Sequence, residues 1–372
     1  MKVSKKVIGA ILLSILATPI SSCMNNTNSP GSTVKDKNTE KDTNPERVEP
    51  EKRIEANKPL LTDIFLADPS AHVFNGKIYI YPSHDIESGI EPNDAGDHYA
   101  MEDYHVISIN DFDSACVDNG QALHLKDVPW VKRQMWAPDA AYKNNTYYLY
   151  FPAKDKNDIF RLGVATSSNP TGPFKAEKDY IPGSFSIDPA VFTDDDNKSY
   201  VYFGGLWGGQ LEKWQSGEFD DNSKGPEGSD IALGPRVAVL TDDMLSFEAA
   251  PQEISIVDES GNPILAKDED KRFFEGPWVH KFKDNYYLSY STGTTHYIAY
   301  AMSKNPKGPF TYKGTILNPV KGWTTHHSIV QFKDKWYIFY HDTSLSGVDY
   351  KRTLKYAELS YNSDGTIKTI EP

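Results

Sequence analysis

The chain has 372 residues and a formal net charge of −13, with 52 acidic residues against 39 lysines and arginines. A surface this acidic argues against nucleic acid and anionic lipid headgroups as partners, because both are bound by basic patches. Neutral sugars remain compatible with it. Its 22 tyrosines, 17 phenylalanines and 7 tryptophans are ample for a large hydrophobic core.

The first 22 residues have the pattern of a signal peptide. Three lysines lie within the first six residues, and the apolar run over 7–20 is too short to serve as a membrane span. The run ends in Ser21-Ser22-Cys23, which resembles a bacterial lipobox. This resemblance implies cleavage before Cys23 and lipidation of its thiol. We therefore expect a protein of the bacterial cell envelope that meets the membrane only through its lipid anchor, with a periplasm-facing anchor favoured over the cell surface. The alternative is an ordinary secretory signal in which Cys23 is incidental.

The segment over 23–57 is rich in Asn, Thr, Ser, Lys, Glu and Pro and has almost no large apolar residue. It cannot bury enough surface to offset its ordering entropy, which predicts a flexible tether. The remaining residues, 58–372, are expected to form one catalytic domain. Loss of the three signal lysines takes the net charge from −13 to −16. With Cys23 acylated, only Cys116 is left, so no intramolecular disulfide is expected.

One pattern recurs five times along this domain: an apolar β run, a polar turn and an aromatic-rich β run. Alternating apolar residues with Asn-Gly or Asp-Asn at the tip indicate a β-hairpin. Two related segments, 165–174 and 301–310, each supply a third strand and a Pro/Gly turn. Repeated small antiparallel sheets predict an all-β fold, a five-bladed β-propeller. A β-sandwich gives no reason for repeating one hairpin five times. The five copies span 71–81, 140–150, 190–203, 278–288 and 328–338.

An ionisable residue lies six to nine positions before the turn of every copy. In a propeller, the first strand of each blade lines the central channel, so residues at equivalent positions should converge on the axis. Clustered acids in a confined funnel raise one another's pKa, so that one stays protonated while another is ionised. Glycoside hydrolysis requires that division between an acid and a base. The five segments are Ala67-Asp68-Pro69, Trp136-Ala137-Pro138-Asp139, Ile187-Asp188-Pro189, Phe274-Glu275-Gly276-Pro277 and Thr325-His326-His327.

These five segments, in this order, resemble the motifs of family 43 glycoside hydrolases. The resemblance implies a five-bladed propeller with an inverting mechanism. It implies that Asp68 is the general base, Glu275 the general acid and Asp188 the residue that tunes the pKa of Glu275, whereas Asp139 has a supporting role. Inversion requires the Asp68 and Glu275 carboxyls to lie roughly 6.5–9.5 Å apart.

The resemblance also bears on metal and substrate binding. His326 matches an axial histidine that binds a structural calcium in many members, and His327 fits less well. Arg352 matches a substrate-binding arginine more loosely. Trp136, Phe274 and Trp207, with Trp323, are aromatic residues suited to sugar faces. The acidic loop 91–103 could bind a cation, although a solvated loop is favoured.

The stretch Tyr81-Pro82-Ser83-His84-Asp85 is similar to members that act as β-xylosidases or α-L-arabinofuranosidases. We therefore expect an exo-acting enzyme that removes terminal β-D-xylose, α-L-arabinofuranose or both from hemicellulose oligosaccharides. Two alternatives stay open at this point. One is an endo-acting arabinanase of the same family, and the other is a non-catalytic glycan-binding propeller lipoprotein.

Overall fold

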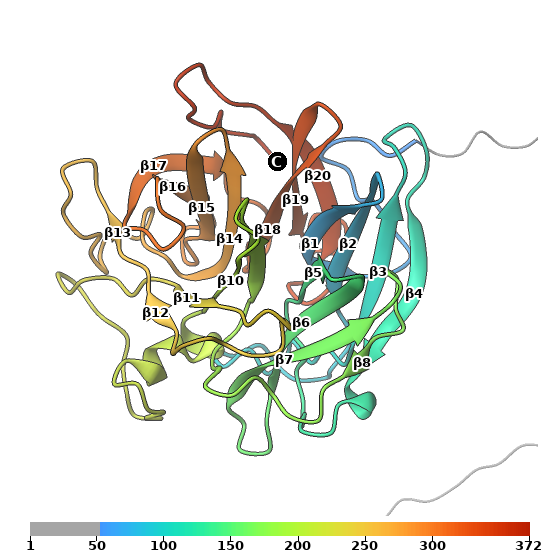
Figure 1. Cartoon of the computed structure of the whole chain (residues 1–372), viewed down its shortest axis with the longest axis horizontal. Coiled ribbons are helices and arrows are strands. Elements are labelled where there is room, and N and C mark those ends of the chain that lie inside the picture. The colour runs from blue at the N-terminus through green and yellow to red at the C-terminus, as the bar shows by residue number, and fades with distance from the viewer. Residues whose placement is uncertain (1–52) are drawn as a thin grey trace, which may run out of the picture. The chain divides into compact units, whose positions relative to one another are not determined.

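Five antiparallel hairpins, one for each copy of the repeat, form the inner part of five β-sheets arranged around a common axis (Figure 1). The computed structural model describes residues 53–372, and these residues form the expected five-bladed β-propeller. The predicted signal peptide, Cys23 and nearly all of the predicted tether lie outside the described residues. In the part that is described, no helix has the length and apolar character needed to cross a membrane.

The first three blades each contain four strands. Blade 1 consists of β1 (Leu66–Phe74), β2 (Lys77–His84), β3 (Asp103–Ile109) and β4 (Val117–His124). Blade 2 consists of β5 (Asp139–Lys143), β6 (Thr146–Lys154), β7 (Phe160–Ser167) and β8 (Lys175–Ala176). Blade 3 consists of β9 (Ala190–Thr193), β10 (Ser199–Phe203), β11 (Arg236–Val239) and β12 (Gln252–Glu253).

The last two blades differ from this pattern. Blade 4 consists of β14 (Glu275–Phe282), β15 (Asn285–Ser291), β16 (Ile298–Ser303), β17 (Phe310–Leu317) and a short parallel edge strand, β13 (Ile256–Val257). Blade 5 consists of β18 (His327–Phe332), β19 (Lys335–Asp342) and β20 (Thr353–Leu359). Three single-turn 3-10 helices lie in connecting loops, namely η1 (Leu125–Asp127), η2 (Trp207–Gly209) and η3 (Leu211–Trp214).

Most of the hydrophobic core of the described residues lies in five layers, one between each pair of neighbouring blades, and a sixth, smaller cluster contains Trp136 and Ile187 of the cavity wall. Alternate residues of a strand point to opposite faces of its sheet, so each blade supplies side chains to two layers. In β2, for example, Ile80 packs toward blade 5, whereas Tyr81 packs toward blade 2. This two-sided burial explains why the second run of every repeat is both apolar and aromatic.

A buried tyrosine on the second strand of every blade donates its hydroxyl to the chain of the next blade. In blades 1 to 4 the acceptors are backbone carbonyl oxygens at 2.6–2.8 Å. A buried hydroxyl is costly unless it is hydrogen-bonded, so these contacts fix how neighbouring blades meet. The donors and acceptors are Tyr81 to Pro170, Tyr150 to Met244, Tyr202 to Pro306, Tyr287 to Gly365 and, in blade 5, Tyr340 to the Asn57 side chain at 3.0 Å.

The ring is closed by the residues that precede β1. The Asn57 and Leu60 amides donate to the carbonyl oxygens of Tyr356 and Leu354 in β20, each at 2.8 Å. Ile54 and Leu60 are both 7% exposed and belong to the layer between blades 5 and 1. Packed structure therefore begins by Ile54, a few residues before the predicted start of the domain at residue 58.

Candidate active site

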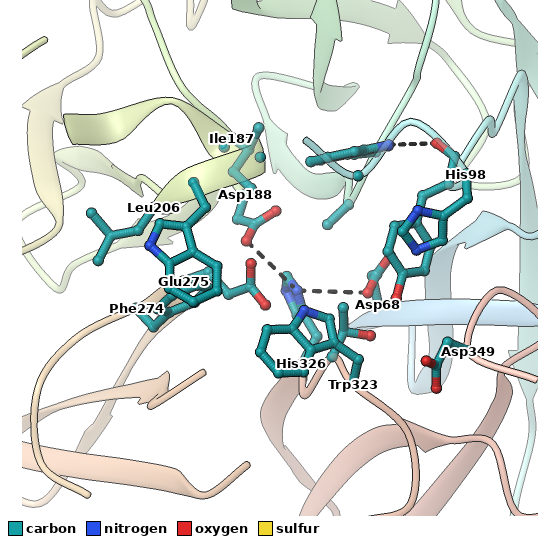
Figure 2. A pocket seen from close by; sticks show the side chains of 18 of the residues that line it. Asp68, His98, Ile187, Asp188, Leu206, Phe274, Glu275, Trp323, His326 and Asp349 are labelled. Atoms are coloured by element: carbon teal, nitrogen blue, oxygen red, sulfur yellow. Dashed lines mark hydrogen bonds and ion pairs between the residues drawn. The ribbon is translucent and has the colours of Figure 1, made fainter. Parts of the chain in front are cut away.

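A cavity of about 320 Å³ opens at one end of the ring and is lined by residues from all five blades. The predicted residues Asp68, Asp188, Glu275 and His326 meet there, on the inner strands or just before them (Figure 2). Further parts of the wall come from the loop after β2, including Asn93, His98 and Tyr99, from the loop after β10, and from the loops that carry Trp323 and Arg352. The convergence expected from the repeat is therefore present.

Irregular backbone aims the carboxyl groups into the cavity. The register of β1 against β2 shifts between Ala67 and Ser70, and that of β14 against β15 shifts between Glu275 and Trp278. Asp68 and Asp188 have φ values of 53° and 58°, in the left-handed region that aspartate tolerates better than most residues. Such bulges re-aim side chains next to active sites.

Asp68 is ionised because a buried arginine faces it. Its carboxylate accepts hydrogen bonds from the Ser83 hydroxyl and, at 3.0 Å, from Nη1 of Arg352. Its backbone amide donates to Nδ1 of His341 at 2.9 Å. Burial by itself would raise the pKa of Asp68, but Arg352 outweighs it and, with the neighbouring histidines and Ser83, lowers the pKa to about 2. Asp68 is therefore available as a base.

Arg352 is held in place by Asp85. Its Nε and Nη2 atoms donate to the two Asp85 carboxylate oxygens at 2.9 and 2.7 Å, a bidentate pair. Its guanidinium also lies 4.9 Å from the centre of the Tyr99 ring. Arg352 lines the cavity as predicted, but Asp85 and Asp68 accept most of its hydrogen bonds. Its main effect is therefore to hold Asp68 in place and to keep the Asp68 carboxylate ionised.

Glu275 has the opposite electrostatic environment. Protein surrounds its carboxyl except on the cavity side, and this burial, with the negative charge of Asp68, raises its pKa to about 8 despite a lowering effect of Arg352. Asp188 accepts a hydrogen bond from the Gly276 amide at 3.0 Å, which ties it to the backbone that carries Glu275. Burial and the charges of Glu275 and Asp68 raise the pKa of Asp188 as well. Together the pair retains a proton at neutral pH.

His326 lies between these groups. Its Nδ1 is 3.8 Å from Oδ1 of Asp68 and 3.9 Å from Oδ2 of Asp188 (Figure 2). Burial lowers the pKa of this imidazole, which is therefore neutral. His327 points elsewhere, with Nε2 2.6 Å from the Ser289 hydroxyl in the neighbouring blade. The choice of His326 over His327 as the residue facing the axis thus agrees with the structure.

The residues around His326 do not by themselves make a calcium site. Calcium takes six to eight oxygen ligands at 2.3–2.6 Å. Among residues 53–372, the only set of three metal-type side chains within mutual reach is one on blade 1, and His326 is not part of it. A calcium ion here would have to be bound mainly through water, so no chemical step is assigned to a metal.

The predicted aromatic residues all line the cavity, but in two different ways. Trp136 and Phe274 are 9% and 3% exposed and form part of the packed wall. Trp207 and Trp323 are 44% and 39% exposed, and their rings stack at 6.1 Å with an angle of 14°. Trp207 has a φ of 54°, which is unusual for a bulky residue. The Trp207 backbone amide donates to the buried Glu212 carboxylate at 2.9 Å, and this hydrogen bond holds the backbone of Trp207. This pair is the exposed platform at the cavity mouth.

Other predicted polar residues lie outside the cavity or in its wall. Asp139 is buried between blades, where its carboxylate accepts from the Ser70 hydroxyl and the Val191 amide, in agreement with a supporting role. In the acidic loop, Asp97 forms an ion pair with Arg133 at 2.7 Å, and only Asp94 of its predicted acids lines the cavity. The sequence reading missed Asp85 and His341, which hold Arg352 and Asp68.

An ionised aspartate and a protonated glutamate facing one cavity, at the mouth of a five-bladed propeller, are the apparatus of a glycoside hydrolase. The family model "Glycosyl hydrolases family 43" matches residues 58–367. The chain belongs to glycoside hydrolase family 43.

Similar proteins cover almost the whole domain. A xylosidase/arabinosidase 43A of Humicola insolens is 57% identical, over 84% of this chain and 99% of the relative. A xylosidase/arabinosidase of Bacteroides ovatus is 53% identical, over 82% of this chain and 95% of the relative. A solved structure of CoXyl43, a β-xylosidase/α-arabinofuranosidase from a compost microbial metagenome, was obtained with xylotriose in a calcium-free form. It is 61% identical, covers 86% of this chain and 98% of its own, and superposes with a TM-score of 0.84.

Proposed function

We propose that this enzyme removes terminal β-D-xylose and α-L-arabinofuranose from short xylan-derived oligosaccharides. The observation that carries the proposal is the opposite protonation of Asp68 and Glu275 in one cavity. Relatives that are more than 50% identical act as xylosidases and arabinosidases, and one binds xylotriose. The wall formed by Asn93 to Tyr99 limits the cavity on one side, which favours a chain end over the middle of a polymer.

In the proposed mechanism, Asp68 accepts a proton from the attacking water while Glu275 gives its proton to the leaving oxygen. Asp188, whose pKa is raised by burial and by the charges of Glu275 and Asp68, shares the retained proton with Glu275 and holds the neighbouring backbone through the Gly276 amide. Protein surrounds the Glu275 carboxyl except toward the cavity, where a glycosidic oxygen would lie. Attack by water in a single displacement inverts the anomeric configuration.

The test is hydrolysis of aryl β-xyloside, aryl α-L-arabinofuranoside and xylotriose by wild type and by Glu275→Gln. We expect the variant to lose several orders of magnitude on xylotriose and far less on nitrophenyl glycosides, whose leaving groups need little protonation. Proton NMR of the first product from a β-xyloside should show α-xylose. Equal losses on both substrate types would exclude Glu275 as the acid, and β-xylose as first product would exclude inversion. Release of xylobiose and larger fragments from a long xylo-oligosaccharide, before xylose, would indicate endo action.

We also propose that the enzyme is anchored in the bacterial envelope through lipidated Cys23. The lipobox-like Ser21-Ser22-Cys23 supports this proposal. Expressed in a Gram-negative host, the wild-type chain should partition into the detergent phase of Triton X-114 and Cys23→Ser into the aqueous phase. Equal partition of the two would exclude the anchor without affecting the assignment of the enzyme.

A further inference from the structure

Blade 1 carries a group of metal-binding side chains that takes no part in the active site. His84 lies at the end of β2, and Asp103 and His105 lie two positions apart on β3, so the last two point to the same face of the sheet. The pairing of Ser83 with Tyr104 places His84 opposite Asp103. None of the three lines the cavity.

The three side chains already stand close enough to share one ion. One ligand atom from each lies within 4.8 Å of the others. Nδ1 of His84 is 2.7 Å from Oδ1 of Asp103, and Nε2 of His105 is 3.9 Å from Oδ2 of the same carboxylate. The rings of the two histidines are 4.9 Å apart. All three side chains are less than a quarter exposed, which limits their freedom to move apart.

Asp118 sets the orientation of His105. Both of its carboxylate oxygens lie 3.0 Å from Nδ1 of His105, so Nδ1 carries the proton and donates it. In the neutral ring, Nε2 then presents a lone pair to the Asp103 carboxylate across 3.9 Å, which is too long for a hydrogen bond. Two electron-rich atoms that face each other in this way are both satisfied by a cation between them. A carboxylate behind a ligating histidine is a common arrangement at metal sites.

We propose that His84, Asp103 and His105 form a binding site for a divalent transition metal, best matched by Zn²⁺, with water as the fourth ligand. Two imidazoles and one carboxylate suit zinc, whereas calcium and magnesium prefer sites made of oxygen alone. The inner ligand set contains one carboxylate, Asp103, and Asp118 places a second behind His105. Binding requires that His84 and Asp103 exchange their 2.7 Å hydrogen bond for contacts to the ion, and that His105 and Asp103 close onto the same ion.

The site would stabilise the strand end that supports the catalytic base. His84 is flanked by Ser83, which donates to Asp68, and by Asp85, which holds Arg352. A metal that joins the end of β2 to β3 fixes the backbone between these two contacts. The metal is thus a structural tie beside the active site and is not a reactant.

The test is zinc binding by the untagged mature chain, measured by isothermal titration calorimetry and by metal content after dialysis. We expect one zinc per chain, a melting temperature that rises with zinc concentration, and loss of both effects in His84→Gln and in His105→Gln. Asp118→Asn should weaken binding by about 10- to 100-fold, as expected for a residue behind the ligand.

Two controls separate this site from other histidines. His124→Gln removes an imidazole from the neighbouring strand, whose Nδ1 accepts from the Lys126 amide, and should leave zinc binding intact. His326→Gln should also retain it, since that histidine lies in the cavity. Circular dichroism and melting without zinc show whether each variant is folded. Stoichiometric binding that persists in folded His105→Gln, or that is lost in His326→Gln alone, would overturn the proposal, as would the absence of binding to wild type.

Discussion

Replacement of Arg352 by glutamine should move the pH profile of the enzyme toward higher pH. Asp68 must be ionised to act as a base, and Arg352 is the main group that opposes the effect of burial on it. Without this cation, only the neighbouring histidines and Ser83 oppose the effect of burial, so the pKa of Asp68 should rise. The pH dependence of kcat/KM reports pKa values of the free enzyme, so its acidic limb should move to higher pH together with the pKa of Asp68.

The size of the change follows from the two pKa values. The lowering from 3.8 to about 2 corresponds to roughly 2.5 kcal/mol in favour of the carboxylate. Arg352 is the largest of several groups that produce this lowering, so its loss should move the acidic limb to higher pH by about one to three units, as expected for an aspartate beside an arginine. Arg352 also lowers the pKa of Glu275, which is about 8 in wild type. The basic limb, which follows the loss of the Glu275 proton, should therefore move to higher pH in the variant too.

The assay is hydrolysis of an aryl β-xyloside from pH 3 to pH 10, with incubation at each pH followed by assay at pH 6 to exclude unfolding. Arg352→Gln leaves the Asp85 carboxylate buried without its partner, which typically costs about 3–5 kcal/mol of stability. The double variant Asp85→Asn/Arg352→Gln avoids this cost. Arg352→Lys keeps the charge and should keep the acidic limb low, although it loses the bidentate pair.

An acidic limb that stays in place in the folded double variant would refute the reasoning. It would mean that Asp68 is kept ionised by its neutral hydrogen-bond donors. A shift as large in Arg352→Lys as in the glutamine variants would show that geometry, and not charge, sets the pKa of Asp68.

Three further predictions concern binding and stability. Trp207→Ala should raise KM for xylotriose several-fold with little change in kcat, and an unchanged KM in steady-state assays would remove Trp207 from the binding platform. Tyr202→Phe should lower the free energy of unfolding by about 1–2 kcal/mol because the Pro306 carbonyl loses its donor, and an unchanged urea midpoint would contradict this role. Ile54→Ala should cost about 2 kcal/mol or more, whereas exposed Lys58→Ala should cost little; equal values would show that closure of the ring does not depend on this packing.

The sequence was sufficient to predict the residues that occupy repeated positions. Asp68, Asp188 and Glu275 each lie at the start of an inner hairpin or just before it, and because the blades are equivalent, similar positions in the repeat become nearby positions in space. The hairpin turns could be predicted as well, because the sequence Asn75-Gly76 favours a tight turn, and both residues adopt the positive φ values, 52° and 75°, that such a turn needs.

Residues outside the repeated positions could not be found in this way. Asp85 follows β2, and His341 lies near the end of β19, so neither belongs to the segments that lead into the hairpins. Asp85 is 267 positions from its partner Arg352, and His341 is 273 positions from its partner Asp68. Only the closed ring brings each pair together. The alternation of apolar and polar residues along a strand does not show where its register shifts. The positive φ values of Asp68 and Asp188 could therefore not be predicted from the sequence. The distinction between the buried Phe274 and the exposed Trp207 likewise depends on loop paths.

Closure by residues 54–60 has a consequence for how the molecule is made. The partners of Asn57 and Leu60 on β20 are synthesised roughly 300 residues later. During synthesis, the outer face of the first blade therefore stays uncovered until the last strand has been made, and only then can the first and last blades pack together. Arg352, which faces Asp68, immediately precedes that same strand. An incomplete chain therefore lacks both the joined ring and the guanidinium that faces Asp68, so the site is assembled only after β20 has been made.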